Sequence, residues 1–148
     1  GTYNVNSEGS SDMYYKGANM LHTLRQLVNN DEKWKQLLRG LNKTFYHQTV
    51  TTQDIEEYMS TFSGLDLTAF FNQYLRDIRI PTFEYSIRKN KLSYRWSAVV
   101  ENFEMPLEIE VNGKTQWLYP TAVWQKTKID ASEISIDRDY YIDHKQLN

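Results

Sequence analysis

The hydrophobic periodicity of the chain changes once, at Pro81, and this change limits the possible folds more than any other feature. Before Pro81, apolar residues recur every three or four positions, which is typical of helices that bury one face. After Pro81, they recur at every second position, which is typical of strands. The sequence therefore predicts an α+β protein, in which an antiparallel helical array is followed by a small antiparallel β-sandwich.

Four helices are predicted before Pro81, after a small, polar stretch (residues 1–12) that predicts an exposed loop. The first helix spans about residues 12–28 and the second begins after Asn29-Asn30. The third begins at Thr51-Thr52 with a capping box, and Asp66 caps the fourth. The predicted buried faces are, in order, Met20, Leu21, Leu24, Leu27 and Val28; Trp34, Leu37, Leu38, Leu41 and Phe45; Ile55, Tyr58, Met59 and Phe62; and Phe70, Phe71, Tyr74, Leu75 and Ile78.

Six or seven short antiparallel strands are predicted after Pro81. In two of them, apolar residues alternate with polar neighbours: Phe83, Tyr85 and Ile87 in the first, and Leu92, Tyr94 and Trp96 in the second. A third leads into Asn112-Gly113, a strong hairpin turn that pairs Val111 with Lys114 and Glu108 with Trp117. Further strands are expected in 122–129 and 133–142. The short link at Ile80–Thr82 predicts two packed subdomains, 1–81 and 82–148.

Charge and composition exclude several classes of function. The chain has 17 basic and 19 acidic side chains, spread evenly along 148 residues, which disfavours nucleic acid as a partner. Because it has no cysteine, disulfides and thiolate chemistry are excluded. No apolar run approaches the roughly 20 residues that span a membrane. No targeting segment is recognisable, and the compartment stays open.

No metal site or hydrolase motif can be assembled from the residues alone. The three histidines (His22, His47 and His144) have no metal-ligand spacing, and no nucleophile elbow or phosphate loop is present. The acid pairs Glu56-Glu57 and Asp130…Glu133 occupy polar positions where charges are usually solvated. The Trp and Tyr residues of the strands would suit sugar stacking, but sandwich cores use the same residues. At the start of the first helix, Tyr14, Tyr15 and Lys16 form either a packed helix end or the wall of a cleft.

The helical half contains an ordered set of motif residues: Tyr14-Tyr15-Lys16-Gly17-Ala18; Leu21, Leu24 and Arg25; Asp31, Leu37 and Leu38; Thr51, Thr52 and Asp54; Asp66, Leu67, Phe70, Phe71 and Tyr74; and Pro81. This set resembles the end of the catalytic domain of the aminopeptidase N family of zinc metallopeptidases, the gluzincins, whose Tyr-x-Lys-Gly-Ala run matches residues 14–18. Residues 82–148 resemble, more loosely, the Ig-like sandwich domain that follows in that family.

The resemblance implies that this chain is the C-terminal piece of a longer aminopeptidase that removes N-terminal residues from peptides. The family's zinc-binding His-Glu-x-x-His helix, its third ligand and its Gly-x-Met-Glu-Asn-type loop precede the Tyr-x-Lys-Gly-Ala run, and this chain has none of them. It implies one catalytic residue, Tyr14, whose hydroxyl would bind the oxyanion of the tetrahedral intermediate beside the zinc. Lys16 is expected to order a loop or pair with an acid outside the chain. The isolated chain is expected to be inactive, with an apolar surface exposed on its first two helices. The alternative is a non-catalytic module that binds proteins or glycans.

Overall fold

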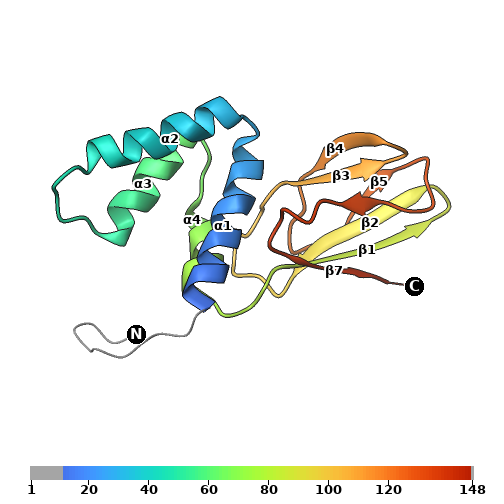
Figure 1. Ribbon diagram of the computed structural model, residues 1–148. Coiled ribbons are helices and arrows are strands. Elements are labelled where there is room, and N and C mark those ends of the chain that lie inside the picture. Colours follow the sequence, from blue (N-terminus) through green and yellow to red (C-terminus); the bar gives the residue numbers. More distant parts are fainter. Residues whose placement is uncertain (1–11, 148) are drawn as a thin grey trace.

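The computed structural model describes residues 12–147 and shows a helical half joined to a two-sheet β-sandwich (Figure 1). The predicted loop 1–11 lies outside the described residues. The helices are α1 (Asp12–Val28), α2 (Asp31–Thr44), α3 (Thr52–Ser63) and the short α4 (Thr68–Phe71), which runs into a π-helical turn, η1 (Asn72–Arg76). Among these residues no helix is both long and apolar enough to span a bilayer. The predicted α+β class is confirmed.

The first three helices begin where the sequence places them, and the first and third also end there. The Asn30 side chain accepts a hydrogen bond from Lys33 N at the start of α2. At the start of α3, Thr51 and Asp54 form the predicted capping box, and Gly64 ends the helix with a left-handed φ of 76°. One predicted buried residue is wrong: Leu38 is 38% exposed, whereas Trp34 and Leu37 hold α2 against the core.

The fourth helix departs most from prediction. Its N-cap is Leu67, and the Asp66 carboxylate instead accepts a hydrogen bond from Thr68 N, just before the helix. Because a π-helical turn holds more residues per turn than an α-helix, the residues after Phe71 shift around the helix axis. Leu75, predicted to face inward, lies in this turn and is 46% exposed. Ile78, also predicted to face inward, lies beyond the end of the helix at Arg76 and is 95% exposed.

Gln73, in the π-helical turn, is fully buried, and its amide connects the helical half to the first loops of the sandwich. The side-chain Nε2 donates to Arg79 O at 2.8 Å, and Oε1 accepts from Val100 N at 2.7 Å. The fully buried Gln73 thus satisfies its own polar atoms with backbone partners on both sides of Pro81. This arrangement fixes the exit of the helical half.

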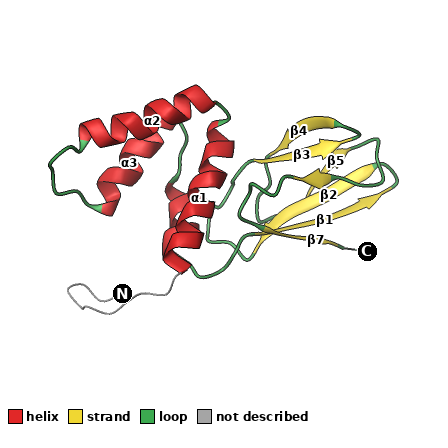
Figure 2. Ribbon diagram, viewed as in Figure 1, coloured by secondary structure: helices red, strands yellow, loops and turns green. Residues whose placement is uncertain are grey.

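The sandwich consists of a four-stranded and a three-stranded sheet (Figure 2). Strands β5-β2-β1-β7 form the first sheet and β4-β3-β6 the second. Their bounds are β1 (Thr82–Arg88), β2 (Lys91–Ser97), β3 (Leu107–Val111), β4 (Lys114–Leu118), β5 (Gln125–Lys128), β6 (Ser135–Ile136) and β7 (Asp143–Gln146). Inward-facing residues of both sheets, including Phe83, Trp96, Leu107 and Ile109, fill the core.

The register of the predicted hairpin is confirmed, but the last strand is not where it was expected. Val111 pairs with Lys114 and Glu108 with Trp117 across a turn in which Asn112 and Gly113 both have positive φ. In the region predicted as one strand, 133–142, only β6 forms. The final strand, β7, lies beyond it and pairs in parallel with β1, so the sandwich is not wholly antiparallel.

Helix α1 is attached to the sandwich through a polar joint. The buried Thr23 hydroxyl accepts a hydrogen bond from Tyr141 N at 2.8 Å, across 118 positions of sequence. Gln26 Nε2 donates to Asp139 Oδ2 at 2.9 Å, and Tyr74 OH donates to Tyr141 O at 2.9 Å. Burial raises the pKa of the Tyr74 phenol further above neutral pH. The joint fixes α1 relative to the sheets.

Candidate functional site

The two tyrosines at the start of α1 project from its first turn. Tyr14 is 72% exposed and Tyr15 is 70% exposed. Within the described residues neither phenol is buried against a neighbour. Their hydroxyl groups are accessible donors at the N-terminal end of a helix that the rest of the chain holds firmly.

Lys16, two residues after Tyr14, connects this helix turn to the end of η1. Its Nζ donates a hydrogen bond of 2.8 Å to the backbone oxygen of Asp77, 61 positions away. The predicted role of Lys16 in ordering a loop is consistent with this contact. Sequence periodicity could not identify Asp77 as the acceptor, because a backbone carbonyl has no residue signature.

The Asp77–Arg79 loop that receives Lys16 is itself cross-linked. Asp77 Oδ1 accepts from Arg79 N at 2.8 Å and Nε at 2.9 Å, and Asp77 Oδ2 accepts from an Arg79 guanidinium nitrogen at 2.7 Å. These hydrogen bonds from Arg79, with a smaller charge effect from Lys16, lower the pKa of the Asp77 carboxyl to about 2. The Asp77 carboxylate is therefore ionised across the physiological range, its charge is balanced by the Arg79 guanidinium, and the loop has a defined shape.

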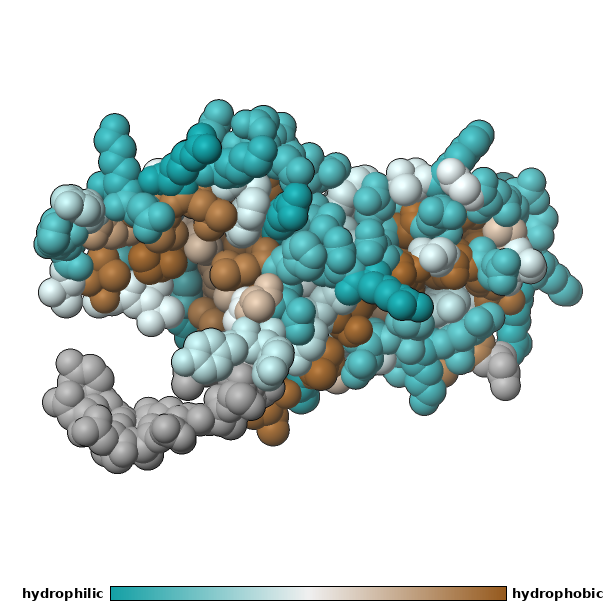
Figure 3. All heavy atoms as spheres, in the orientation of Figure 1, coloured by the Kyte–Doolittle hydropathy of each residue, from teal (hydrophilic) through white to brown (hydrophobic). Residues whose placement is uncertain are grey.

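Exposed apolar side chains occur on the helical half, although not as a continuous face on the first two helices. Ile78 sits between the two cross-linked residues of the loop, and Leu75 precedes it. On α2, Leu38 is the exposed apolar residue, followed by Tyr46 and Val50 in the link to α3. Figure 3 shows hydrophobic surface over the α2–α3 region, whereas the sandwich face in view is mainly hydrophilic. A protein that covers the helical half would meet these residues.

The remaining predicted candidates lie apart from one another. His22 is exposed, with Nε2 3.4 Å from Asp139 Oδ1, while His47 follows α2 and His144 lies in β7. Glu56 pairs with Arg76 at 2.7 Å, so it is part of a surface ion pair. In residues 12–147 no three His, Asp or Glu side chains come together as a metal site.

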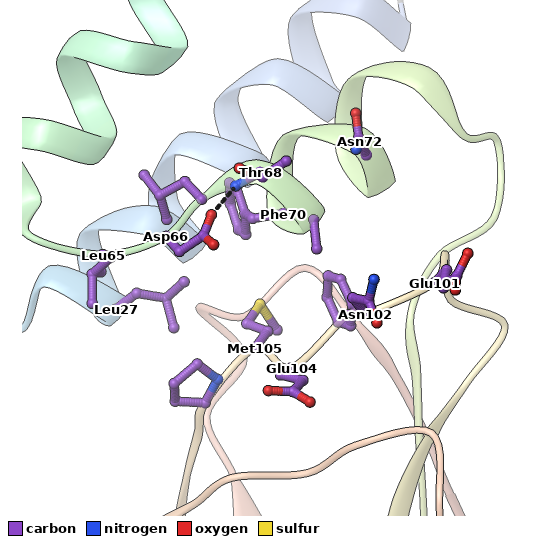
Figure 4. A pocket seen from close by; sticks show the side chains of 14 residues that line it. Leu27, Leu65, Asp66, Thr68, Phe70, Asn72, Glu101, Asn102, Glu104 and Met105 are labelled. Carbon is purple, nitrogen blue, oxygen red and sulfur yellow. Dashed lines mark hydrogen bonds between the residues drawn. The ribbon is translucent and has the colours of Figure 1, made fainter.

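A groove of about 460 Å³ lies between the helical half and the loop that connects β2 to β3 (Figure 4). Leu27, Phe70 and Met105 supply apolar lining, and the acidic residues among the lining are Asp66, Glu101 and Glu104. Sequence reasoning missed this groove because its walls come from three separate segments. Leu27 is 13 helical positions from Tyr14, or about 20 Å along α1, so the groove is distinct from the tyrosine site.

Comparison with known proteins gives a fold and no family. No protein-family model and no curated protein sequence matches the chain. Among solved structures, it is similar to aminopeptidase A of Legionella pneumophila in complex with aspartic acid, with a TM-score of 0.66 and 16% identity. The match covers 94% of this chain but 18% of that protein. The likeness establishes that a helical unit followed by this sandwich occurs as one part of a much longer aminopeptidase.

Proposed function

We propose that this chain is the C-terminal part of a zinc-dependent aminopeptidase that removes N-terminal residues from peptides. In this proposal residues 1–81 are the helical end of a thermolysin-like catalytic domain, and residues 82–148 are an Ig-like sandwich domain. Two independent observations support it. The ordered motif set from Tyr14 to Pro81 resembles the aminopeptidase N family, and the whole fold is similar to part of an aminopeptidase.

Tyr14 is the catalytic residue in this proposal. Its exposed phenol would donate a hydrogen bond to the oxyanion that develops on the scissile carbonyl. A phenol donates without carrying charge at neutral pH, so it need not be neutralised before substrate binds. A preplaced donor of this kind lowers a barrier by about 3–4 kcal/mol. The place of Tyr14 in the Tyr14-Tyr15-Lys16-Gly17-Ala18 motif is the observation that carries the assignment, and its exposed hydroxyl suits this role.

The metal would be held outside this chain, because the zinc ligands of the family that the chain resembles precede the Tyr-x-Lys-Gly-Ala run. Bound zinc would polarise the carbonyl and activate water. The contribution of this chain is then limited to the Tyr14 donor and to the surface that places it. Peptide substrates and the preceding part of the same protein are accordingly its proposed partners.

The test uses the parent protein with Tyr14→Phe and a matched control, Tyr15→Phe. Loss of the Tyr14 hydroxyl should lower kcat by about 100- to 1,000-fold while the zinc content stays the same. The Tyr15 variant, which removes a neighbouring exposed hydroxyl, should keep its kcat. An unchanged kcat for Tyr14→Phe would remove this residue from the mechanism. Metal-dependent hydrolysis of an aminoacyl-nitroanilide by the 148-residue chain alone would contradict the fragment proposal.

A non-catalytic interaction module is the second candidate, and the loop between β4 and β5 favours it. Tyr119, Val123 and Trp124 are exposed there, and the Arg95 guanidinium lies 4.8 Å from the centre of the Trp124 ring. Aromatic side chains of this kind suit proteins and glycans as ligands. The sequence that precedes residue 1 in the gene distinguishes the two: an intact His-Glu-x-x-His with its third ligand supports the enzyme, and a degenerate motif supports the module.

A further inference from the structure

We propose that Lys16 is a positioning residue for Tyr14, acting through its hydrogen bond to the backbone of Asp77. The inference rests on the proposed function, because it needs the Tyr14 hydroxyl to have a catalytic role. It assigns a task to a side chain that would not itself touch the substrate.

Among the described hydrogen bonds of residues 14–18, the one donated by Lys16 Nζ reaches a distant segment of the chain. Tyr14 and Tyr15 are exposed, and among the residues whose burial is described the first buried one in α1 is Met20. Helix ends lack part of their internal hydrogen bonding and tend to fray. The half-buried Lys16 side chain, with Nζ 2.8 Å from Asp77 O, lies between the exposed tyrosines and the buried part of the helix.

The acceptor of the Lys16 hydrogen bond, the backbone oxygen of Asp77, belongs to a loop that other hydrogen bonds hold in place. Arg79 makes three hydrogen bonds to the Asp77 carboxylate, and the backbone oxygen of Arg79 accepts from buried Gln73. A lysine that binds a rigid carbonyl fixes its own helix turn, whereas one that binds a mobile loop does not. Buried Gln73 therefore holds the backbone of Arg79, and Arg79 holds Asp77. Asp77 in turn holds Lys16 and the helix turn that carries Tyr14.

A catalytic donor is sensitive to such support, because a misplacement of about 1 Å can lower a rate about 100-fold. Lys16→Met keeps most of the apolar stem and removes the ammonium donor. In the parent protein we expect this change to lower kcat by about 10- to 100-fold. KM should change little, because Lys16 supports a transition-state contact and does not bind substrate.

A double-mutant cycle with Tyr14→Phe is the decisive experiment. If Lys16 acts through the Tyr14 hydroxyl, Lys16→Met should have almost no further effect on kcat once that hydroxyl is gone. Lys16→Arg, which keeps a cationic donor, should restore most of the lost kcat. Lys33→Met is a matched control: Lys33 Nζ donates to Ser63 O at 2.7 Å, an equivalent contact between other helices, and its loss should leave kcat unchanged.

Amide hydrogen exchange on the 148-residue chain tests the brace without any activity. Lys16→Met should speed exchange of the amides of residues 16–18, and Lys33→Met should not. Equal kcat losses from Lys16→Met in both Tyr14 backgrounds, or exchange rates that match the Lys33 control, would overturn the inference while the proposed function stands. If Tyr14→Phe alone leaves kcat unchanged, the catalytic role of Tyr14 fails, and the positioning role fails with it.

Discussion

Thr23→Val should weaken the joint between α1 and the sandwich without changing the shape of its core. The Thr23 side chain is fully buried, donates to Asn19 O at 3.0 Å and accepts from Tyr141 N at 2.8 Å. Valine has nearly the same volume but cannot accept a hydrogen bond. The Tyr141 N–H would then lie in a partly buried position without a partner, whereas Asn19 O keeps its bond within the helix.

The size of the effect follows from these two changes. An unsatisfied, largely buried donor costs about 1–3 kcal/mol. Replacing the hydroxyl by a methyl group returns up to about 0.8 kcal/mol through added apolar burial. Taking the middle of the first range, about 2 kcal/mol, the free energy of unfolding should therefore fall by about 1–2 kcal/mol. For a chain of this size that corresponds to a decrease in Tm of roughly 3–6 °C.

Urea unfolding of Thr23→Val, with Thr61→Val as control, measures this prediction. Thr61 is an exposed residue of α3, so its variant carries the same change in helix propensity without the buried hydrogen bond. Amide exchange at Tyr141 should accelerate in Thr23→Val and stay slow in Thr23→Ser, which keeps a hydroxyl. If the two valine variants differ in unfolding free energy by less than about 0.5 kcal/mol, the hydroxyl does not hold the joint.

Three further changes test other parts of the structure. Gln73→Met should lower the free energy of unfolding by about 2–4 kcal/mol, because two backbone groups lose their partner, while the exposed Gln53→Met should change it little in the same urea titration. The ionised Asp77 carboxylate stabilises the fold at pH values above its ordinary pKa of 3.8, and this contribution disappears as the pH falls toward about 2. In acid titrations, Asp77→Asn should make the decline in unfolding free energy over that interval shallower. Gly40→Ala should destabilise the protein because the new Cβ would clash with the Tyr58 hydroxyl. In a Tyr58→Phe background the same change should stabilise the helix by about 1 kcal/mol, and a loss of stability in both backgrounds would contradict the clash.

The parts of the fold that sequence predicts well are those determined by local chemistry. The Thr51–Asp54 capping box, the Gly64 stop and the Asn112-Gly113 turn each satisfy backbone groups a few residues away, so their signal is contained in a short window. The alternating residues of β1 and β2 also define which side of each strand is buried. From these features the positions of most helices and of the first two hairpins can be predicted.

The parts that sequence missed depend on distant partners. The π-helical turn after Phe71 contains buried Gln73, which binds the backbone N–H of Val100 in the sandwich. No local sequence pattern predicts a contact between residues so far apart. Strand β7 is polar and exposed, and it forms because β1 offers an open edge. The same holds for the candidate site: Tyr14 was identified by its motif, but the Asp77 carbonyl that braces its helix was not.

The parallel pairing of β7 with β1 has a consequence for synthesis of the protein. Strand β1 can pair with β2 as soon as residue 97 has emerged from the ribosome, but its other edge stays open until residues 143–146 follow. An unpaired edge can recruit a strand from another chain. The nascent sandwich is therefore exposed to mispairing throughout the translation of β3 to β6, and a slower arrival of β7 should increase aggregation without altering the stability of the finished protein.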